Sequence, residues 1–231
     1  MTRAKLTDVV DELVRTHGEP ELPPPRGALD WICWETVGYL CDDERRAEAF
    51  AALRKRTRLS PERILAAPIG ELAAITRVGG IHPELRARRL HEIAELALEE
   101  FGGDLEAVLA RPAKEALAAL KKFPAIGRPG AEKILLMTGA RPLLALESNG
   151  LRALVRLGFG TEAKGYDATY RSVAAAVADE ITGRDCAWLA RAHHLLRRHG
   201  QTLCRRSEPR CRDCPLSRRC AWFTNATTAR D

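Results

Sequence analysis

Apolar residues recur every three or four positions through most of this chain of 231 residues, which is the spacing of one face of an α-helix. Leu6, Val9, Val10 and Leu13 form the first such series. No segment of useful length alternates apolar and polar residues as a half-buried strand would. Aromatic residues, which favour strands, make up only 5% of the chain. The sequence therefore predicts an all-α protein.

Glycine and proline divide this pattern into about ten short helices with short connections. Ser60-Pro61 is typical of a helix start, because serine caps the first turn and proline is tolerated at the first helical position. Gly102-Gly103 is typical of a helix end. The expected helices cover residues 4–17, 28–40, 42–54, 61–66, 70–77, 84–101, 113–122, 131–138, 149–157, 168–181 and 187–199.

Four of the seven cysteines are crowded into seventeen residues near the C-terminus: Cys204, Cys211, Cys214 and Cys220. Pro209 and Pro215 supply turns that would let the four thiols converge on one centre. Zinc and a cubane iron–sulfur cluster both accept four thiolates. Zinc sites often contain two Cys-x-x-Cys pairs and only one is present, so the spacing favours an iron–sulfur cluster and leaves zinc open.

Ten arginines surround these cysteines between Arg184 and Arg219, against three acidic residues, a local charge of +7 compared with +6 for the whole chain. Such an excess suits a phosphate backbone. Part of it can also balance the charge of an anionic cluster, and a merely solvated basic surface is the alternative. We interpret Trp222 and Phe223, just after the last cysteine, as a shield for the cluster.

The cellular setting follows from two further features of the sequence. No uninterrupted apolar stretch approaches the roughly 18 residues of a membrane span. The first residues lead directly into an amphipathic segment, without the apolar core of a secretory signal. We therefore expect a cytoplasmic protein with no membrane partner, in which an odd number of cysteines does not form a disulfide framework.

A turn rich in glycine and proline, residues 123–130, separates two helical segments. Such a turn directs backbone N–H groups and the start of the second helix at one point. It can therefore hold a phosphate without reading base sequence. Taken alone, it could also be an ordinary connection between helices.

Three features together resemble the endonuclease III-like DNA glycosylases of the helix-hairpin-helix superfamily, over nearly the whole chain. Phe123-Pro-Ala-Ile-Gly-Arg128 is similar to the family's Leu-Pro-Gly-Val-Gly-Arg hairpin. Leu144-Ala-Leu-Glu-Ser-Asn149 is similar to its Ile-Ala-Val-Asp-Thr-His segment, at the family's distance from the hairpin. The cysteine spacing matches that of the family's cluster, with His199-Gly200 before the first ligand.

The resemblance implies an all-α, two-domain helix-hairpin-helix DNA glycosylase fold. A six-helix barrel would span residues 28–142, and residues 1–27 with 143–231 would form an iron–sulfur cluster domain. The cofactor would be a 4Fe-4S cluster on the four C-terminal cysteines. The partner would be double-stranded DNA with one nucleotide flipped out. We expect a monomer associated with the nucleoid.

The resemblance also implies which residues contact DNA: Tyr39, His82, Phe123, Ala125, Gly127, Arg128 and Gly130. Ala125 stands where the family has the first hairpin glycine. Tyr39 could fill the gap left by a flipped base by stacking, although Tyr39, Trp31 and Trp34 could equally be barrel core, which we favour for the tryptophans. Glu35, one helical turn before Tyr39, could reach the base pocket.

Two departures from the family pattern, at Glu147 and Pro129, bear on the chemistry. Glu147 stands at the family's catalytic aspartate and keeps the carboxylate that stabilises positive charge on the sugar and deprotonates water. Pro129 stands where bifunctional members carry the lysine that attacks the sugar. The favoured function is a monofunctional DNA glycosylase of base-excision repair, hydrolysing the N-glycosidic bond of a flipped damaged or mismatched base, with AP lyase activity weak or absent.

Three alternatives to this interpretation stay open. Lys133, one turn after Pro129, could act as a substitute nucleophile, which would make the protein a bifunctional glycosylase and AP lyase. Glu147 could be a purely structural carboxylate. The chain could also be a non-catalytic protein that binds DNA damage.

Overall fold

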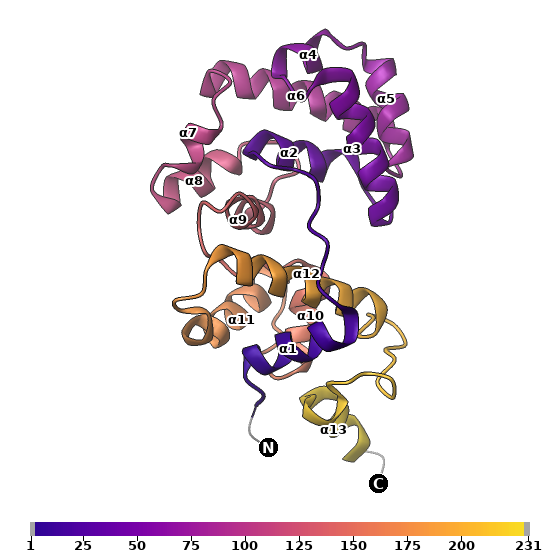
Figure 1. Cartoon of the computed structure of the whole chain (residues 1–231), viewed down its shortest axis with the longest axis vertical. Helices are drawn as coiled ribbons and strands as arrows, with labels where there is room; N and C mark the ends of the chain where they lie inside the picture. Colours follow the sequence, from indigo (N-terminus) through magenta and orange to yellow (C-terminus); the bar gives the residue numbers. More distant parts are fainter. Residues whose placement is uncertain (1–2, 229–231) are drawn as a thin grey trace. The chain divides into compact units, whose positions relative to one another are not determined.

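The computed structural model of the chain describes residues 3–228, and this part contains thirteen α-helices and one 3-10 helix (Figure 1). It contains no β-strand, apart from an isolated bridge between Tyr39 and Gly80. The all-α prediction is confirmed. In the same residues, every helix is too short or too polar to cross a membrane.

The chain divides into two compact units. One unit combines Met1–Leu22 with Pro142–Asp231, and the other consists of Pro23–Arg141. The chain therefore enters the first unit, leaves it at the three prolines that begin with Pro23, and returns to it after Arg141.

The unit of residues 23–141 contains eight helices: α2 (Ala28–Val37), α3 (Asp43–Thr57), α4 (Pro61–Ala66), α5 (Ile69–Val78), α6 (Pro83–Phe101), α7 (Glu106–Leu109), α8 (Ala113–Leu120) and α9 (Arg128–Met137). The long helix α6 packs against α2, α4 and α5. Its buried residues Leu90, Ile93, Ala94 and Ala97 recur every three or four positions, so one face of α6 forms part of the core.

The helix α2 is buried on nearly all sides and carries the tryptophans. Trp31 and Trp34 are 3% and 6% exposed, and Trp34 packs edge-on against Phe50 of α3 with ring centroids 5.3 Å apart. The interpretation of both tryptophans as core is confirmed. Tyr39, by contrast, is 52% exposed and lies outside this core.

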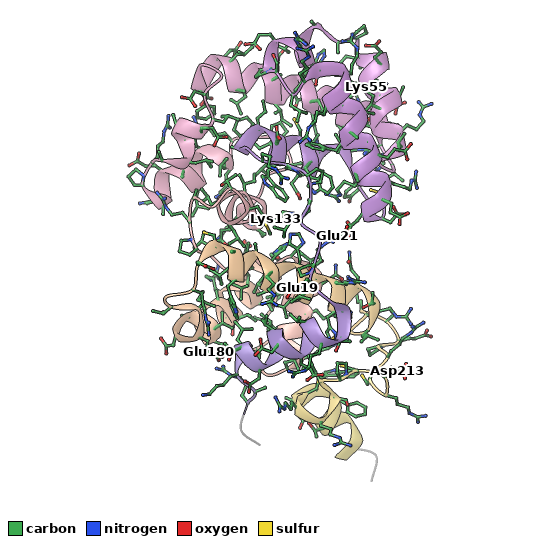
Figure 2. All side chains as sticks on the ribbon, in the orientation of Figure 1. Glu19, Glu21, Lys55, Lys133, Glu180 and Asp213 are labelled. Atoms are coloured by element: carbon green, nitrogen blue, oxygen red, sulfur yellow. The ribbon has the colours of Figure 1, made fainter. Side chains whose placement is uncertain are left out.

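The other unit contains α1 (Leu6–His17), α10 (Ser148–Arg156), α11 (Tyr166–Ile181), α12 (Cys186–Thr202), the 3-10 helix η1 (Ser217–Arg219) and α13 (Ala221–Thr228). The helix α12 packs against α1 and α10. Gly200 allows the close approach to α10, because a Cβ atom there would lie 2.5 Å from the carbonyl oxygen of Asn149. Glu180 of α11 accepts hydrogen bonds from the Leu6 N–H and from Arg3, which joins α1 to α11 (Figure 2).

The helices differ from the sequence expectation most clearly at the start of α9 and in two additional helices. The helix α9 begins at Arg128 and contains Pro129 in its first turn, where the missing N–H would have had no acceptor within the helix. The prediction that residues 123–130 interrupt the helix was therefore too long. Two helices were not expected: α7 is a single turn, too short to show a period, and α13 follows the last cysteine.

Candidate functional site

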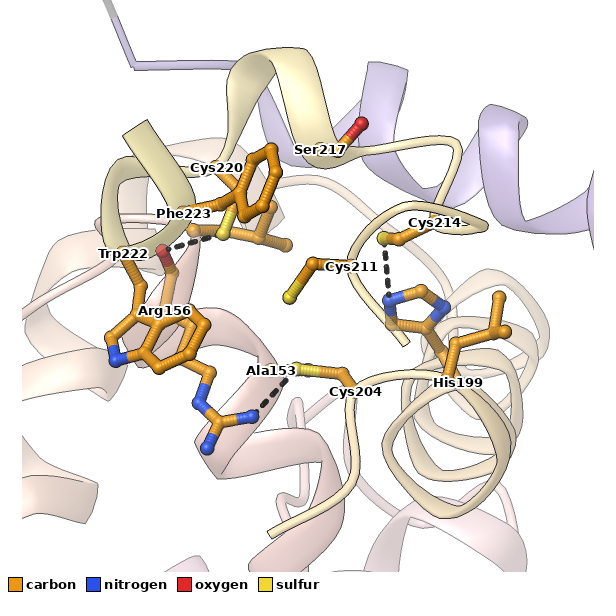
Figure 3. A pocket seen from close by; sticks show the side chains of 12 residues that line it. Ala153, Arg156, His199, Cys204, Cys211, Cys214, Ser217, Cys220, Trp222 and Phe223 are labelled. Carbon is orange, nitrogen blue, oxygen red and sulfur yellow. Dashed lines mark hydrogen bonds between the residues drawn. The ribbon is translucent and has the colours of Figure 1, made fainter. Parts of the chain in front are cut away.

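The four C-terminal cysteines line one pocket, which we call the cysteine pocket (Figure 3). Its walls come from α10, the end of α12 and the segment that follows: Ala153, Arg156, Leu157, His199, Leu203, Cys204, Cys211, Cys214, Ser217, Cys220, Trp222 and Phe223. Figure 3 shows the four thiol groups around the same hollow. The loops between the cysteines therefore bring all four thiols to one pocket, as the cysteine spacing predicts. Trp222 and Phe223 lie in the wall, as a shield would.

Arg156 closes one side of the cysteine pocket. Its Nη1 donates to the sulfur of Cys204 at 3.5 Å, and its carbonyl oxygen accepts from the thiol of Cys220 at 3.2 Å. Its guanidinium group lies 4.7 Å from the ring centroid of Trp222. The positive charge beside the sulfur atoms favours their deprotonated form.

Burial opposes deprotonation of the same thiols. It raises the pKa of Cys211 and Cys220, and it raises the pKa of Cys214 to about 11. His199, whose Nε2 lies 3.6 Å from the Cys214 sulfur, is also buried, which lowers its pKa to about 4. Cys211, Cys214 and Cys220 are therefore costly to ionise in this pocket unless a bound cation compensates.

The four thiols of the cysteine pocket are the donor set that a cubane iron–sulfur cluster accepts, with one cysteine at each of its four irons. Four thiolates at about 2.3 Å from one zinc ion would lie only about 3.8 Å from each other. Within residues 3–228, no three His, Cys, Asp or Glu side chains come close enough to hold a single metal ion.

Glu147 is the N-cap residue of α10, and both of its carboxylate oxygens are held. Oε1 accepts from the Gly150 N–H at 2.6 Å, and Oε2 accepts from the side-chain amide of Asn149 at 2.8 Å. The chain before it is fixed as well, because the Tyr166 hydroxyl donates to the Leu146 carbonyl at 2.7 Å and His193 bonds the Ala145 carbonyl. The carboxylate is therefore immobile and only partly buried.

Arg152 connects Glu147 to the cysteine pocket within the same unit. Its Nη2 donates to the Asn149 side chain and to the Gly200 carbonyl, both at 2.8 Å, and its Nε donates to the Cys204 carbonyl at 3.0 Å. Burial lowers the pKa of Arg152, but an arginine keeps its charge in proteins. A change in the loop of Cys204 can thus reach the Glu147 carboxylate through two hydrogen-bonded side chains.

The turn between α8 and α9, together with the first turn of α9, carries five of the predicted DNA-contacting residues. Ala125 has φ +64°, the left-handed conformation that glycine adopts most easily, so the turn keeps its shape without the family's glycine. Phe123 is 2% exposed and stacks on Phe101 at 5.6 Å, so its side chain belongs to the core and only its backbone can face a ligand. Gly127 is the N-cap residue of α9. The N–H groups of the first turn lack acceptors within the helix.

Arg128 begins α9 with its side chain half-exposed. Its Nε donates to the carboxylate of Glu132, one turn further on, at 2.8 Å. Gly130 lies in the same turn, and a Cβ atom there would make only an ordinary contact with Ile126. Arg128 is therefore oriented along the helix surface near the first-turn N–H groups.

Tyr39, His82 and Ala125 come together at a second pocket, lined by Glu35, Thr36, Gly38, Tyr39, Arg46, His82, Leu85, Arg86, Arg89 and Ala125. This pocket lies in the unit of residues 23–141. The rings of Tyr39 and His82 are 6.4 Å apart. Three residues predicted to contact DNA, from three separate segments of the sequence, therefore share one concave surface.

Lys133 and Glu35 form an ion pair beside this pocket. Lys133 Nζ lies 2.7 Å from Glu35 Oε1, and the two side chains are 17% and 20% exposed (Figure 2). Arg46 Nη1 lies 3.8 Å from the same oxygen. The ammonium group of Lys133 is thus engaged by a carboxylate rather than presented as a free amine.

The arginine-rich stretch is partly used inside its own unit. Arg191 pairs with Glu19, Arg198 donates to the His17 carbonyl at 3.0 Å, and Arg219 lies 3.8 Å from Asp8. These three arginines of the stretch therefore contact other parts of their unit as well as supplying positive charge.

No protein-family model matches the chain. Endonuclease III of Rickettsia prowazekii (strain Madrid E) is 34% identical over 107 residues, which are 46% of this chain and 46% of that protein. The match thus spans about half the length of this relative.

Two solved structures share the fold. A trapped endonuclease III–DNA covalent intermediate superimposes with a TM-score of 0.74 at 19% identity, covering 97% of this chain and 99% of that one. A thermostable thymine-DNA glycosylase superimposes with a TM-score of 0.72 at 17% identity, covering 95% and 97%.

The two helices around the turn at Ala125, together with an otherwise all-α architecture, define a helix-hairpin-helix protein. The similarities in sequence and fold confirm the resemblance: the chain has the fold of endonuclease III and is similar to endonuclease III in sequence over about half of its length.

Sequence reasoning missed Arg152, Arg156 and Arg86, which make the most hydrogen bonds around the two pockets. A signal for the first two exists. Arg152 and Arg156 are four residues apart on α10, so they share a helix face. No comparable signal marks Arg86, whose acceptors lie on distant segments.

Replacing Arg152 by methionine should lower the free energy of unfolding by about 2 to 4 kcal/mol, because the carbonyls of Gly200 and Cys204 lose a charged donor. Urea-induced unfolding followed by circular dichroism measures the change. Arg171→Met removes an exposed arginine from the same unit and should change stability little. Equal stability of the two variants would contradict the role given to Arg152.

Proposed function

We propose that this protein is a monofunctional DNA glycosylase of base-excision repair that hydrolyses the N-glycosidic bond of a flipped damaged or mismatched base. The observation that carries the proposal is the Glu147 carboxylate, held by two hydrogen bonds at the start of α10 in an endonuclease III-like fold. The structural neighbours, an endonuclease III bound to DNA and a thymine-DNA glycosylase, support it.

The fixed carboxylate suits this reaction. Breaking the N-glycosidic bond builds positive charge on the sugar, and an anion that need not reorient stabilises that charge most effectively. Each oxygen of Glu147 accepts one hydrogen bond from the protein and keeps further acceptor capacity, so the group can also take a proton from the attacking water. The two roles need no other titrating group.

Duplex DNA would be held by its phosphates at the turn between α8 and α9. The N–H groups that begin α9 and the Arg128 side chain supply the donors there. Tyr39 and His82 would meet the bases beside the flipped nucleotide, because Tyr39 is exposed and the two rings share one pocket. Residues 28–142 would form the six-helix barrel, and residues 1–27 and 143–231 the cluster domain.

The lyase step of bifunctional enzymes has no free amine in this scheme. Pro129 lacks one, and the Lys133 ammonium group is engaged by Glu35 in a mostly buried pair. An amine held as an ammonium ion by a carboxylate is a poor nucleophile. We therefore assign Lys133 to holding Glu35 rather than to attack on the sugar.

The cysteine pocket would bind a 4Fe-4S cluster through Cys204, Cys211, Cys214 and Cys220. When bound, such a cluster supplies electron-transfer capacity and cross-links the C-terminal segment. The chain's own contribution is the Arg156 hydrogen bond to Cys204 and the apolar wall that excludes water. Arg152 then joins this segment to α10, so the cluster would also stabilise the helix whose N-cap residue is Glu147.

Glu147→Gln should lower the single-turnover excision rate at least about a hundredfold, because an amide carries no negative charge and cannot take a proton from water. The assay is a panel of oxidised, alkylated, deaminated and mismatched duplexes, scored for abasic sites after hot alkali. Glu162→Gln, an exposed change in the same unit, should leave the rate unchanged. If no duplex yields an abasic site while salt-sensitive binding persists, the protein is a non-catalytic damage binder.

Borohydride reduction in the presence of damaged duplex should trap no covalent protein–DNA complex, because Pro129 has no amine and Glu35 engages the ammonium group of Lys133. Lys133→Ala and Lys114→Ala, an exposed lysine on α8, should behave alike in this assay. A trapped complex that survives Glu147→Gln and disappears only with Lys133→Ala would establish the bifunctional alternative.

Protein purified without oxygen should be brown, with broad visible absorbance and about four irons per chain. Cys214→Ser should lose colour and iron and unfold at a lower temperature. Cys186→Ser changes a cysteine of the same unit outside the pocket and should keep both. A colourless protein with one zinc per chain would replace the cluster assignment.

A further inference from the structure

Two loops of the unit of residues 23–141 are joined side by side, and we call them the two-loop element: residues 38–41 after α2 and residues 79–82 before α6. The Tyr39 N–H donates to the Gly79 carbonyl at 2.9 Å, and the Ile81 N–H donates to the Tyr39 carbonyl at 3.3 Å. These bonds form the only bridge of extended backbone within the described residues.

The tip of the two-loop element is apolar and exposed. Tyr39, Leu40 and Ile81 are 52%, 74% and 44% exposed. Three exposed apolar side chains on adjacent loops are unusual unless they meet another surface. In the proposed glycosylase, side chains of this kind can separate stacked bases and occupy the space that a flipped nucleotide leaves.

Arg86 lies beneath the two loops and binds both. It is 2% exposed. Its Nη1 donates to the carbonyls of Val37 and Gly79, and its Nη2 donates to the carbonyl of Gly80 at 2.7 Å. One buried guanidinium therefore holds the end of α2 and the start of the second loop together. Val37 and Arg86, which this contact joins, are 49 residues apart in the sequence.

The glycines of the second loop make this contact possible. A Cβ atom on Gly79 would lie 1.9 Å from the Val37 carbonyl oxygen, and one on Gly80 would lie 2.1 Å from the Tyr39 carbonyl oxygen. Gly80 also has φ +113°, which other residues rarely adopt. Any larger residue would force the loops apart.

We propose that Arg86 is a positioning residue, which locks the two loops into one rigid element so that Tyr39, Leu40 and Ile81 enter the duplex together. The proposal rests on the proposed glycosylase function. A preformed element loses less conformational entropy on insertion than two independent loops. More of the binding free energy is then left for unstacking the bases around the target.

The requirement for Arg86 should depend on how firmly the target base is stacked. A lesion in a fully paired duplex must be unstacked, whereas a lesion in a single-nucleotide bulge is already loosened. Loss of the Arg86 hydrogen bonds should therefore slow excision from paired duplex much more than from the bulge. A defect in folding or in the catalytic carboxylate would slow both substrates equally.

The test compares Arg86→Met and Gly80→Ala with two matched controls. Arg88→Met removes an exposed arginine from the same helix, and Gly70→Ala adds a methyl group where nothing lies within 4 Å. Arg86→Lys keeps the charge but not the fork of donors, and it serves if Arg86→Met does not fold. Thermal unfolding by circular dichroism identifies the folded variants.

Arg86→Met and Gly80→Ala should slow single-turnover excision from the paired duplex at least about tenfold. The same two variants should slow excision from the bulge no more than about threefold. The rates of Arg86→Lys should lie between those of Arg86→Met and those of the unaltered protein. Equal slowing on both substrates by folded variants, or no slowing on either, overturns the proposal.

The fluorescence of 2-aminopurine beside the target provides a readout that does not need excision, because it rises when the base unstacks. The unaltered protein and both controls should raise it on binding, and Arg86→Met should not. If the unaltered protein excises no lesion, the glycosylase proposal fails, while this signal still decides the role of Arg86. An equal rise with Arg86→Met and Arg88→Met would refute it.

Discussion

The hydrogen bonds of Arg152 are the constraint on which the unit of residues 1–22 and 142–231 depends most. The side chain leaves α10 and reaches the end of α12 at Gly200 and the first cysteine of the pocket at Cys204, while the same guanidinium fixes Asn149 against Glu147. Removing this one group would leave three acceptors without a charged donor. Because α10 is short, a shift of this helix would move both its N-cap residue Glu147 and its contacts with the cysteine pocket.

Arginines that bind backbone carbonyls recur in both units and serve one purpose. Arg152 and Arg86 each hold two segments that are distant in sequence, and neither has a carboxylate as its hydrogen-bonded partner. A guanidinium with five donors in a fixed plane is well suited to several carbonyls at once. Where the described residues form no strand, as between residues 3 and 228, irregular segments carry many carbonyls that need a partner. Part of the chain's positive charge is therefore structural, and it stands beneath the loops that the proposed function uses.

The sequence predicted the helices where local chemistry decides the outcome. Ser60 accepts from the Arg63 N–H and Asp42 from the Arg45 N–H, so these two helix starts lie where the capping residues put them. The start of α9 was missed because Pro129 can begin a helix as well as end one. The cysteine spacing predicted a shared pocket, which the fold contains. The partners of Arg86 and the Lys133–Glu35 pair could not be predicted, since they join residues that only the tertiary fold brings together.

The turn between α8 and α9 keeps its shape although Ala125 in the turn and Pro129 at the start of α9 depart from the family's pattern. Ala125 occupies a left-handed conformation that costs about 1 to 2 kcal/mol relative to glycine, and the fold tolerates that cost at an exposed position. Pro129 adds no strain, because its fixed φ fits the first turn of α9. The backbone that would hold a phosphate is thus retained, while the amine that would attack the sugar is absent. Its nearest replacement, Lys133, already neutralises Glu35 in a place where an unpaired carboxylate would be costly to bury. Binding geometry and nucleophilic chemistry are therefore separable in this turn, and the proposed function uses the first without the second.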